Sequence, residues 1–600
     1  MAHPTQLPSI ETDVERPKLN LNASEIRILA LRHGHDDDPI TCDLQVVQLD
    51  SSIKPTYDAL SYVWGDPTIR SPVILDGRLH QVTVNLAAAL RRLRFPAQDR
   101  RLWVDALCID QKNDAEKSHQ VNLMSRIYSN AQKGLVWLGD YTEDSSECSE
   151  QQDSRLGQSG VVIKQEEAFH AFECIQILAN ARRPDIHRPV VEENNTGDPG
   201  GIQQVTTKHV MGVAALMRLS WWERIWTVQE VILPARVIVI CGAMQLDWKS
   251  VERALFNMHD YRDDDRLFGP DTFDFMTTFL TQVFAISSTR ILHGDNRVSI
   301  LEVLAGFRPR VASDDRDKIY ALLGLGYIED FRLIADYSLD WREVYQRATE
   351  TLLKVPAIGL KCLIRQHEFD HDPDLPSWVP DWRAQTESTQ FDETLLLDKY
   401  HMFKAAARTR LTVGPSPDGE LRLMGTSLDE IVLFLAAEGT DPRASAQAIE
   451  RSWLDKLRES VDLADTYPHP QGGGYNYTEA CFRTARSDLV IVPFGSGYQR
   501  LHIWASLGGI TRSPRPHLLG TDFRKPFLTK SGLLGMGPRD AQPGDRVYIL
   551  HGGNIPFVLR RAPQNTASNC FTYVGHAYVD GVMDGEAMDG SRDSEWVNLV

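Results

Sequence analysis

The chain has 600 residues, of which 42% are hydrophobic and 24% are charged, and its formal net charge is -18. These fractions are typical of globular proteins, and the length predicts two or three domains, because one hydrophobic core does not grow to this size. The acidic excess argues against nucleic-acid binding as the main activity, because affinity for a phosphate backbone comes largely from Lys and Arg. No apolar run reaches the roughly 18 residues of a membrane span, so none is expected.

The amino-terminal segment, residues 1–24, is expected to be a disordered leader. It is polar, contains prolines and lacks the apolar core of a secretion signal. The eight cysteines are spread along the chain without a CxxC pair, which argues against a disulfide scaffold and against a zinc module. We therefore expect a reducing compartment, the cytosol or the nucleus, and we assign the protein to the cytoplasm.

The first half of the chain alternates between apolar runs and helical patterns. Helices are expected at 116–131, where Asn113 and Glu116 form a loose capping box, and at 221–233. Strands that alternate with helices predict an α/β domain with a mostly parallel sheet flanked by helices. The expected strands are ALSYVW (59–64), RLWVDALCI (101–109), GLVWLG (134–139) and RVIVICG (236–242).

The strand within TYDALSYVWGDP has a large aromatic residue at its end. Gly65 and Pro67 are poorly tolerated inside strands, so the strand must end near Trp64. In parallel sheets, ligands favour the crevice beyond the carboxyl ends of the strands, and both Trp64 and Asp110 follow such strands. Trp64 is therefore either core packing at a strand end or part of a binding site, and the residues leave both interpretations open.

The segment SWWERIWTVQEVILP (220–234) places a carboxylate on an apolar helix face. Ser220 and Glu223 fit an S-x-x-E capping box, which predicts a helix that begins at Trp221 and ends before the following proline. Because burial of an unpaired carboxylate is unfavourable, we expect Glu230 either to pair with an Arg or to serve in a site. The residues on this face are Trp222, Trp226, Glu230 and Leu233, and the candidate cations are Arg224 and Arg236.

Two histidine-containing segments have the residue types of metal sites without the context that such sites need. HGHDDD (33–38) is a charge run that we interpret as a solvated loop. HEFDH (367–371) matches H-E-x-x-H, a zinc pattern that requires a helix, and Pro373 and Pro376 argue against one there. We therefore predict no metal site.

Two polar stretches, 140–160 and 182–201, are expected to be surface insertions on either side of a helix at 166–181. Beyond residue 382 the chain changes to short β-like runs separated by turns. RVYILHGGNIPFVLR (546–560) predicts a hairpin with HGGN at its turn, and FTYVGHAYV (571–579) predicts a further strand. The carboxyl-terminal region is therefore expected to be mixed α+β and rich in strands.

Three segments together resemble the motif blocks of the fungal heterokaryon incompatibility (HET) domain. They are YDALSYVWGD (57–66), LWVDALCIDQKNDAEKSHQVNLMSRIYSNAQKGLVWLG (102–139) and WWERIWTVQEV (221–231). DRDKIYALLGL, LPSWVPDW and the run from GDRVYILHGG to VDGVMDGEA are similar to the region that accompanies this domain in many fungal proteins. The resemblance implies a HET region over 25–330, with core motifs at 57–242 and a variable insert at 140–210, followed by a second region over 331–600.

The resemblance also implies a function. HET proteins are associated with self/non-self recognition and programmed cell death when genetically different hyphae fuse, and the domain is distantly similar to TIR domains. WTVQE (226–230) has the Trp-x-x-x-Glu spacing of the TIR helix that carries the NAD-cleaving glutamate, although Thr227 stands where a Cys commonly follows the Trp. By this resemblance YDALSY matches the first TIR strand, and the protein is a TIR-like NAD glycohydrolase that needs no cofactor, with NAD as substrate and Glu230 as catalytic residue. The residues expected to line the site are Ser61, Trp64, Asp105 and Asp110.

A non-enzymatic interpretation stays open beside this one. It is a signalling or scaffold module that forms homo-oligomers and recruits an incompatibility partner protein. A scaffold would leave Glu230 salt-bridged to an Arg in a closed crevice, whereas an enzyme would hold it in an open cleft near Trp64. Neither interpretation calls for nucleic acid or a membrane.

Overall fold

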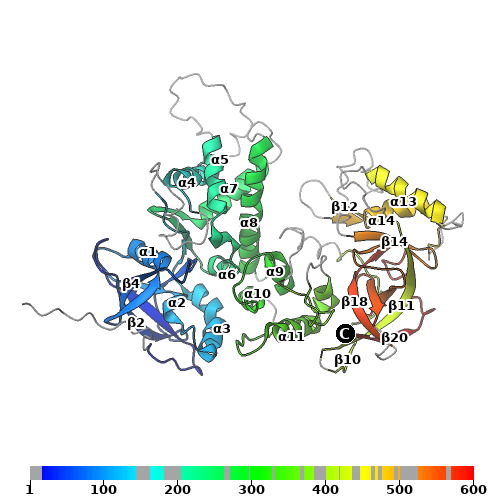
Figure 1. The fold of residues 1–600 in the computed structure, drawn as a ribbon, viewed down its shortest axis with the longest axis horizontal. Helices are drawn as coiled ribbons and strands as arrows, with labels where there is room; N and C mark the ends of the chain where they lie inside the picture. Colours follow the sequence, from blue (N-terminus) through cyan, green and yellow to red (C-terminus); the bar gives the residue numbers. More distant parts are fainter. Residues whose placement is uncertain are drawn as a thin grey trace, which may run out of the picture. The chain divides into compact units, whose positions relative to one another are not determined.

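The computed structural model shows two compact units (Figure 1). The first comprises Met1–Tyr327 with Ile334–Asp340, and the second comprises Ile328–Leu333 with Trp341–Val600. The residues that the structure describes are 16–142, 162–180, 205–261, 270–295, 297–326, 332–364, 371–383, 401–417, 419–435, 446–460, 467–469, 476–491, 498–500, 524–562 and 569–600.

The first unit is built on a nine-stranded sheet with the order β5-β4-β2-β1-β6-β3-β7-β8-β9. The central strands β3 and β7 are buried along their whole length, which explains why their sequences are mostly apolar, with Asp58 and Ser61 as the polar residues of β3. The strands are β1 (Glu25–Leu31), β2 (Thr41–Gln48), β3 (Asp58–Tyr62), β4 (Arg70–Leu75), β5 (Arg78–Thr83), β6 (Arg100–Trp103), β7 (Gly134–Trp137), β8 (Val237–Cys241) and β9 (Met244–Asp247).

This sheet is mixed, whereas the sequence predicted a mostly parallel one. The central strands β6, β3, β7 and β8 pair in parallel, and β2 pairs in parallel with β4. The pairs β1–β2, β1–β6, β4–β5 and β8–β9 are antiparallel. The turn between β4 and β5 contains Asp76 and Gly77 with φ values of 50° and 75°, as a two-residue hairpin turn requires. Such short turns force antiparallel neighbours, because a parallel pair needs a long crossover.

Helices of the first unit surround the sheet and extend from it (Figure 1). The helix predicted at 116–131 is confirmed as α3, and Asn113 caps it by accepting a hydrogen bond from the Glu116 N–H (3.2 Å). The helix predicted at 166–181 is confirmed as α4, which packs against α5 and α7. The helices are α1 (Val84–Leu93), α2 (Asp105–Cys108), α3 (Asp114–Asn130), α4 (Gln165–Asn180), α5 (Thr207–Met217), α6 (Thr227–Ile232), α7 (Trp248–Tyr261), α8 (Pro270–Gly294), α9 (Ile300–Phe307) and α10 (Asp317–Tyr320).

Two predicted elements are corrected. The apolar run 101–109 is only partly a strand: β6 ends at Trp103, and Asp105–Cys108 forms the helical turn α2. The segment 220–233 is not one helix, because Arg224 is extended (φ −74°, ψ 137°) between a 3-10 turn, η3 (Ser220–Glu223), and α6. The cause of this break lies far away in the sequence.

Val311 breaks the helix by forming a β-bridge across it. Its N–H donates to the Glu223 carbonyl (2.6 Å), and its carbonyl accepts from the Ile225 N–H (3.0 Å). Leu219 takes the N-cap position of η3, so the predicted capping box at Ser220 is not formed. The predicted stripe of Trp222, Trp226, Glu230 and Leu233 is consequently divided between η3 and the separate helix α6.

Helices α4 and α5 approach each other most closely at Gly212. A Cβ atom there would lie 2.5 Å from the Glu167 carbonyl oxygen and 3.1 Å from the His170 Cβ. We expect Gly212→Ala to lower the free energy of unfolding of the first unit by about 1–3 kcal/mol through overpacking. Gly294→Ala is the control, because a Cβ at Gly294 meets no described atom within 4 Å. Thermal denaturation of both variants checks this, and equal melting temperatures would contradict the packing argument.

The second unit is rich in strands, as predicted. Its main sheet has the order β16-β17-β18-β20-β11-β14-β15-β19, with β10 on β11. Because β16 also pairs with β11, the strands β16, β17, β18, β20 and β11 close into a ring. The predicted hairpin is confirmed, since β16 and β17 pair antiparallel, and 571–579 is divided between β18 and β19. A two-stranded sheet of β12 and β13 stands apart.

The remaining elements of the second unit complete this description. The strands are β10 (Val413–Gly414), β11 (Leu421–Phe434), β12 (Leu489–Ile491), β13 (Tyr498–Arg500), β14 (Arg524–Thr529), β15 (Leu534–Pro538), β16 (Arg546–Leu550), β17 (Phe557–Arg561), β18 (Cys570–His576), β19 (Tyr578–Val579) and β20 (Ser594–Leu599). The helices are α11 (Trp341–Lys354), η4 (Gly359–Leu363), α13 (Ala446–Ser460) and α14 (Tyr477–Ala485).

Two predictions about the whole chain concern absences. Among the described residues, no helix is both long and apolar enough to cross a lipid bilayer. The seven cysteines in the described part of the chain are all buried and free of disulfides. His367 to Asp370, which carry most of the H-E-x-x-H pattern, lie outside the described residues.

Candidate functional site

Glu230 lies on the short helix α6 and is 6% exposed. Its Oε2 atom has no hydrogen-bond partner within the described part of the chain. A carboxyl oxygen in this position is unfavourable for stability, because it has lost water without gaining a full replacement. The prediction that Glu230 would be buried is confirmed, and its environment must therefore explain how the group is tolerated.

Two hydroxyl groups, one from β3 and one from α3, lie beside this carboxyl group. The side chains of Ser61 and Tyr128 lie close enough to favour its ionised form. The Ser61 Oγ also accepts a hydrogen bond from the Trp221 indole (2.9 Å), and the Tyr128 hydroxyl donates to the Leu60 carbonyl (3.0 Å). Ser61 and Tyr128 are both completely buried. These bonds hold the two hydroxyls in place beside Glu230.

Arg224 supplies the positive charge of the site without forming an ion pair with Glu230. Its guanidinium donates to the carbonyl oxygen of Tyr62 and lowers the pKa of Glu230 through space. Among the described residues, Glu230 has no ion pair within 4.0 Å, so the direct pair with Arg224 or Arg236 is not formed. Arg236 instead contacts the half-buried Asp247 (3.0 Å).

Asp105 is a second carboxyl group in this environment. Burial raises the pKa of Asp105, while Arg224 and the Trp64 indole lower it. The pKa of Glu230 is raised from its ordinary 4.5 to about 7, chiefly by burial and in addition by the negative charge of Asp105. Arg224 acts against this rise at both groups. Glu230 is consequently near its midpoint of ionisation at neutral pH, where both the charged and the neutral form are populated.

Trp64 is tied to this site through Asp105. Its indole N–H donates to Asp105 Oδ2 (2.8 Å), and the other oxygen, Oδ1, accepts from the Ala106 N–H (2.7 Å). Trp64 is 37% exposed, so it is not core packing. The indole holds one of the two acidic groups while part of its own surface faces solvent.

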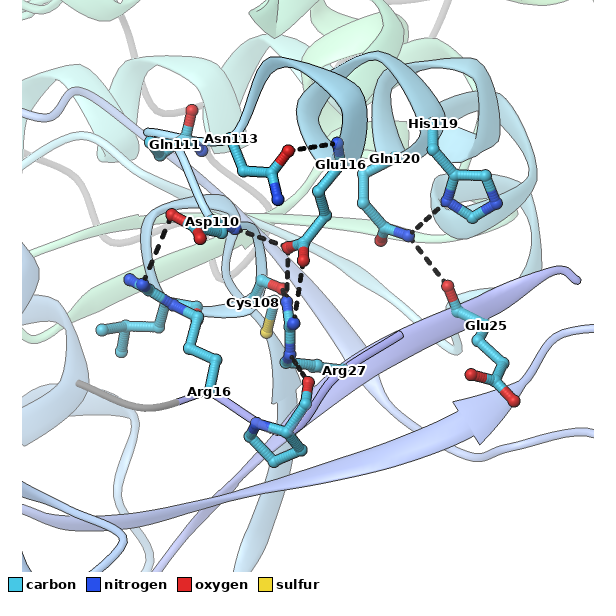
Figure 2. A network of polar contacts seen from close by, with 12 residues as sticks. Arg16, Glu25, Arg27, Cys108, Asp110, Gln111, Asn113, Glu116, His119 and Gln120 are labelled. Atoms are coloured by element: carbon cyan, nitrogen blue, oxygen red, sulfur yellow. Dashed lines mark hydrogen bonds and ion pairs between the residues drawn. The ribbon is translucent and has the colours of Figure 1, made fainter. Parts of the chain in front are cut away.

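The structure brings Ser61, Trp64 and Asp105 into one electrostatic group with Glu230, but it places Asp110 in a different network (Figure 2). The Asp110 N–H donates to Glu116 Oε1 (2.7 Å), and its carboxylate lies 3.8 Å from Arg16. Glu116 forms a bidentate ion pair with Arg27, in which Nη1 donates to Oε1 (2.6 Å) and Nη2 donates to Oε2 (3.0 Å). Figure 2 shows the Glu116 carboxylate between the Arg27 guanidinium and the Asp110 backbone. Asp110 is therefore linked through its backbone to the buried Arg27–Glu116 pair, while its own carboxylate is partly exposed.

Three residues of the site escaped the sequence analysis. Tyr62 is 3% exposed, and its buried hydroxyl has no hydrogen-bond partner in the described structure. Tyr128 lies in the helix predicted at 116–131 without being singled out there, and Arg224 was expected only as a candidate ion-pair partner. Aromatic residues in apolar patterns usually indicate core packing, so no signal in one sequence separates Tyr62 and Tyr128 from the core.

A further buried carboxyl group holds the start of α6. Asp317 on α10 accepts a hydrogen bond from the Trp226 indole (2.9 Å) and another from the Tyr337 hydroxyl. Burial raises the pKa of Asp317 to about 6, although both of these donors lower it. The DRDKIYALLGL segment therefore supports the helix that carries Glu230.

Comparisons with known proteins agree with these motifs. Residues 57–230 match the family model of the heterokaryon incompatibility protein (HET), and residues 517–598 match the Het-6 β-barrel domain. Heterokaryon incompatibility protein 6, OR allele, of Neurospora crassa is 26% identical over 676 aligned residues, which cover 96% of each chain. No solved structure matches the chain.

The first match begins at Tyr57, immediately before β3, and ends at Glu230 on α6, so it spans the segments that supply Ser61, Asp105, Tyr128 and Glu230. The second match falls within the second unit. The chain therefore contains a segment similar to the HET family, which includes Glu230, and a segment similar to the Het-6 β-barrel domain in its second unit.

Proposed function

We propose that this protein acts in heterokaryon incompatibility, in the self/non-self recognition that leads to programmed cell death, by cleaving NAD at the bond between nicotinamide and ribose. Glu230 is the proposed catalytic residue, in a TIR-like arrangement within the cytoplasm. The observation that carries the proposal is the buried Glu230 carboxyl group, whose pKa is raised to about 7 and whose Oε2 has no hydrogen-bond partner among the described residues. Perturbed carboxyl groups of this kind concentrate at functional sites.

The chemistry of this cleavage suits a single carboxylate. The bond between nicotinamide and the ribose breaks through an oxocarbenium-like transition state, and water adds to the sugar carbon to give ADP-ribose, nicotinamide and a proton. Neutral nicotinamide leaves without needing a proton from an acid. The Glu230 carboxylate can stabilise the developing positive charge or orient the ribose hydroxyls, as carboxylates do in glycoside hydrolysis.

The neighbouring groups support complementary roles. Arg224, Ser61 and Tyr128 favour the ionised form of Glu230, which is the form that stabilises a cation. Trp64 has exposed surface on which an adenine or nicotinamide ring can stack, and its bond to Asp105 holds it in position. We expect Trp64→Ala to raise KM more than it lowers kcat, because stacking contributes to binding rather than to bond breaking.

The test is nicotinamide release from NAD by the purified full chain. Glu230→Gln should lower the rate by at least about 100-fold, because it removes charge stabilisation of the transition state. Glu223→Gln is the matched control: it lies in the same motif block, its side chain is exposed, and its rate should equal that of the wild type. Equal rates for Glu230→Gln and wild type would refute the catalytic role.

One observation favours a second function, a non-enzymatic scaffold that oligomerises and recruits partners. Glu230 is only 6% exposed, as expected for a carboxyl group that supports structure. If the wild type released no nicotinamide as a monomer or as an assembled oligomer, and Glu230→Gln still caused cell death in fungal cells, the scaffold would be the better explanation. Light scattering of the same samples reports the oligomeric state.

A further inference from the structure

The geometry points to a binding site for one divalent transition-metal ion between α4 and α5, formed by His170, Glu173 and His209. One ligand atom from each residue lies within 4.8 Å of the other two. The Glu173 Oε2 atom is 3.0 Å from His209 Nε2 and 3.7 Å from His170 Nδ1. Two imidazoles and one carboxylate, with one position left for water, form a ligand set that suits zinc and related ions.

His170 is already oriented as a metal ligand. Its Nε2 atom lies 3.4 Å from the Glu166 carboxylate, which favours a proton on that nitrogen. Its Nδ1 atom is buried, has no hydrogen-bond partner in the described part of the chain, and faces Glu173. Metal-bound histidines characteristically direct their second ring nitrogen to a carboxylate, because this fixes the tautomer and the ring orientation.

His209 has to change its tautomer when the ion binds. Its Nδ1 accepts the Thr206 N–H (2.9 Å), so in the neutral ring the proton is on Nε2 and is donated to Glu173. An ion at Nε2 moves this proton to Nδ1, where the Thr206 hydroxyl oxygen, 3.1 Å away, can accept it. No proton is lost in this exchange. The ion replaces the hydrogen bond from His209 to Glu173, and the Thr206 N–H loses Nδ1 as its acceptor while the Thr206 hydroxyl becomes the acceptor of the Nδ1 proton.

The backbone of the two helices fits this arrangement. His170 and Glu173 are three residues apart on α4 and so share a face. The close approach at Gly212 brings α5 directly against His170. Ligand atoms around a tetrahedral zinc ion with bonds of about 2.0–2.1 Å lie roughly 3.3 Å apart. The two measured separations bracket this value, so small side-chain rotations complete the site.

The test uses the EDTA-treated full chain, titrated with Zn²⁺ by calorimetry and with Co²⁺ by visible absorption. Wild type should bind one more equivalent of metal than His170→Ala or Glu173→Gln, or bind it at least about tenfold more tightly. Zn²⁺ at a hundredfold excess over Kd should raise the melting temperature of the wild type by roughly 5 °C and leave that of the two variants unchanged. Glu173→Gln keeps an acceptor for His209, so it tests the ligand rather than the fold.

His33→Ala is the control for binding at ordinary surface histidines, because His33 lies on an exposed loop of the same unit. The His33→Ala variant should bind Zn²⁺ with the stoichiometry and affinity of the wild type.

Nitrogen NMR of the His209 ring should show the proton moving from Nε2 to Nδ1 when Zn²⁺ is added. Equal stoichiometry and affinity in wild type, His170→Ala and Glu173→Gln, or an unchanged His209 tautomer, would overturn the proposal.

Discussion

Glu230→Gln should make the first unit more stable than the wild type at pH 8 and equally stable at pH 4. The pKa of Glu230 rises from an ordinary 4.5 to about 7 on folding, chiefly because the group is buried. Such a shift corresponds to an upper limit of about 3 kcal/mol in the free energy of unfolding. Gln is neutral at every pH and has nearly the same shape, so it avoids the unfavourable burial of charge.

The direction of the pH dependence follows from proton binding. Between pH 4.5 and 7 the folded state holds a proton on Glu230 that the unfolded state has lost, so the wild type loses stability as the pH rises through this window. Below it both states are protonated, and the wild type equals the variant. Above pH 7 the difference is complete and stays constant.

Thermal denaturation of wild type and Glu230→Gln at a series of pH values measures this difference. Hydrogen exchange of the β3 and α6 amides assigns it to the first unit, which matters because two units need not unfold together. The Glu223 carboxylate is exposed, so the difference in stability between Glu223→Gln and wild type should not change with pH. If Glu230→Gln were less stable than wild type at pH 8, the buried charge would be satisfied, and the carboxyl group would be structural.

Glu116→Gln should destabilise the first unit by about 3–5 kcal/mol, the characteristic effect of breaking a buried ion pair from one side. The side chains of Arg27 and Glu116 are only 2% and 8% exposed, and the guanidinium also donates to the carbonyls of Cys108 and Pro17. The substitution leaves Arg27 as a buried cation without its carboxylate. Gln can still accept from the Asp110 N–H, so the loss reports the charge rather than that hydrogen bond.

At acid pH the difference in the free energy of unfolding between wild type and Glu116→Gln should become smaller. Burial raises the pKa of Glu116, but the Arg27 guanidinium and the Asp110 N–H outweigh it, so the net pKa is lowered. The pair therefore contributes its full stability above the ordinary Glu pKa and loses it as the pH falls through the lowered value in the folded state. Chemical denaturation at pH 7 and in acid measures both effects.

The matched control for this ion pair is Asp247→Asn, which breaks the exposed pair with Arg236. Those side chains are 55% and 29% exposed, so the change should stay within about 1 kcal/mol. If the two substitutions had equal effects, burial would not be the reason for the importance of the Arg27–Glu116 pair.

Local sequence patterns were sufficient to predict those elements whose contacts in the folded structure favour the same conformation as their own sequence. Strands β3, β7 and β8, helix α3 and the hairpin of β16 and β17 all lie where the sequence predicted them. They are encoded by mostly apolar runs, by the Asn113 cap and by a glycine turn, and each of these signals acts within a few residues. The sheet direction was predicted less well, because the short turns at its edges were not recognised.

The helix predicted at 221–233 failed because of a partner that is distant in the sequence. Val311 converts a helical pattern into η3 and α6, because two backbone hydrogen bonds to another segment outweigh the propensity of Arg224 for helix. The apolar run at 101–109 could not be distinguished from a strand, because short buried helices and strands look alike in sequence.

The sequence by itself determined the HET motif blocks, the order of most central elements and the burial of Glu230, because these depend on residue type and local spacing. Only the tertiary structure decided what surrounds that carboxyl group. It joined Trp64 to Asp105 by a hydrogen bond, replaced the expected ion pair by Arg224 acting through space, and linked Asp110 to the Arg27–Glu116 pair instead. The electrostatic environment of Glu230 is set by groups that come together only in the folded state, so it cannot be inferred from a single amino-acid sequence.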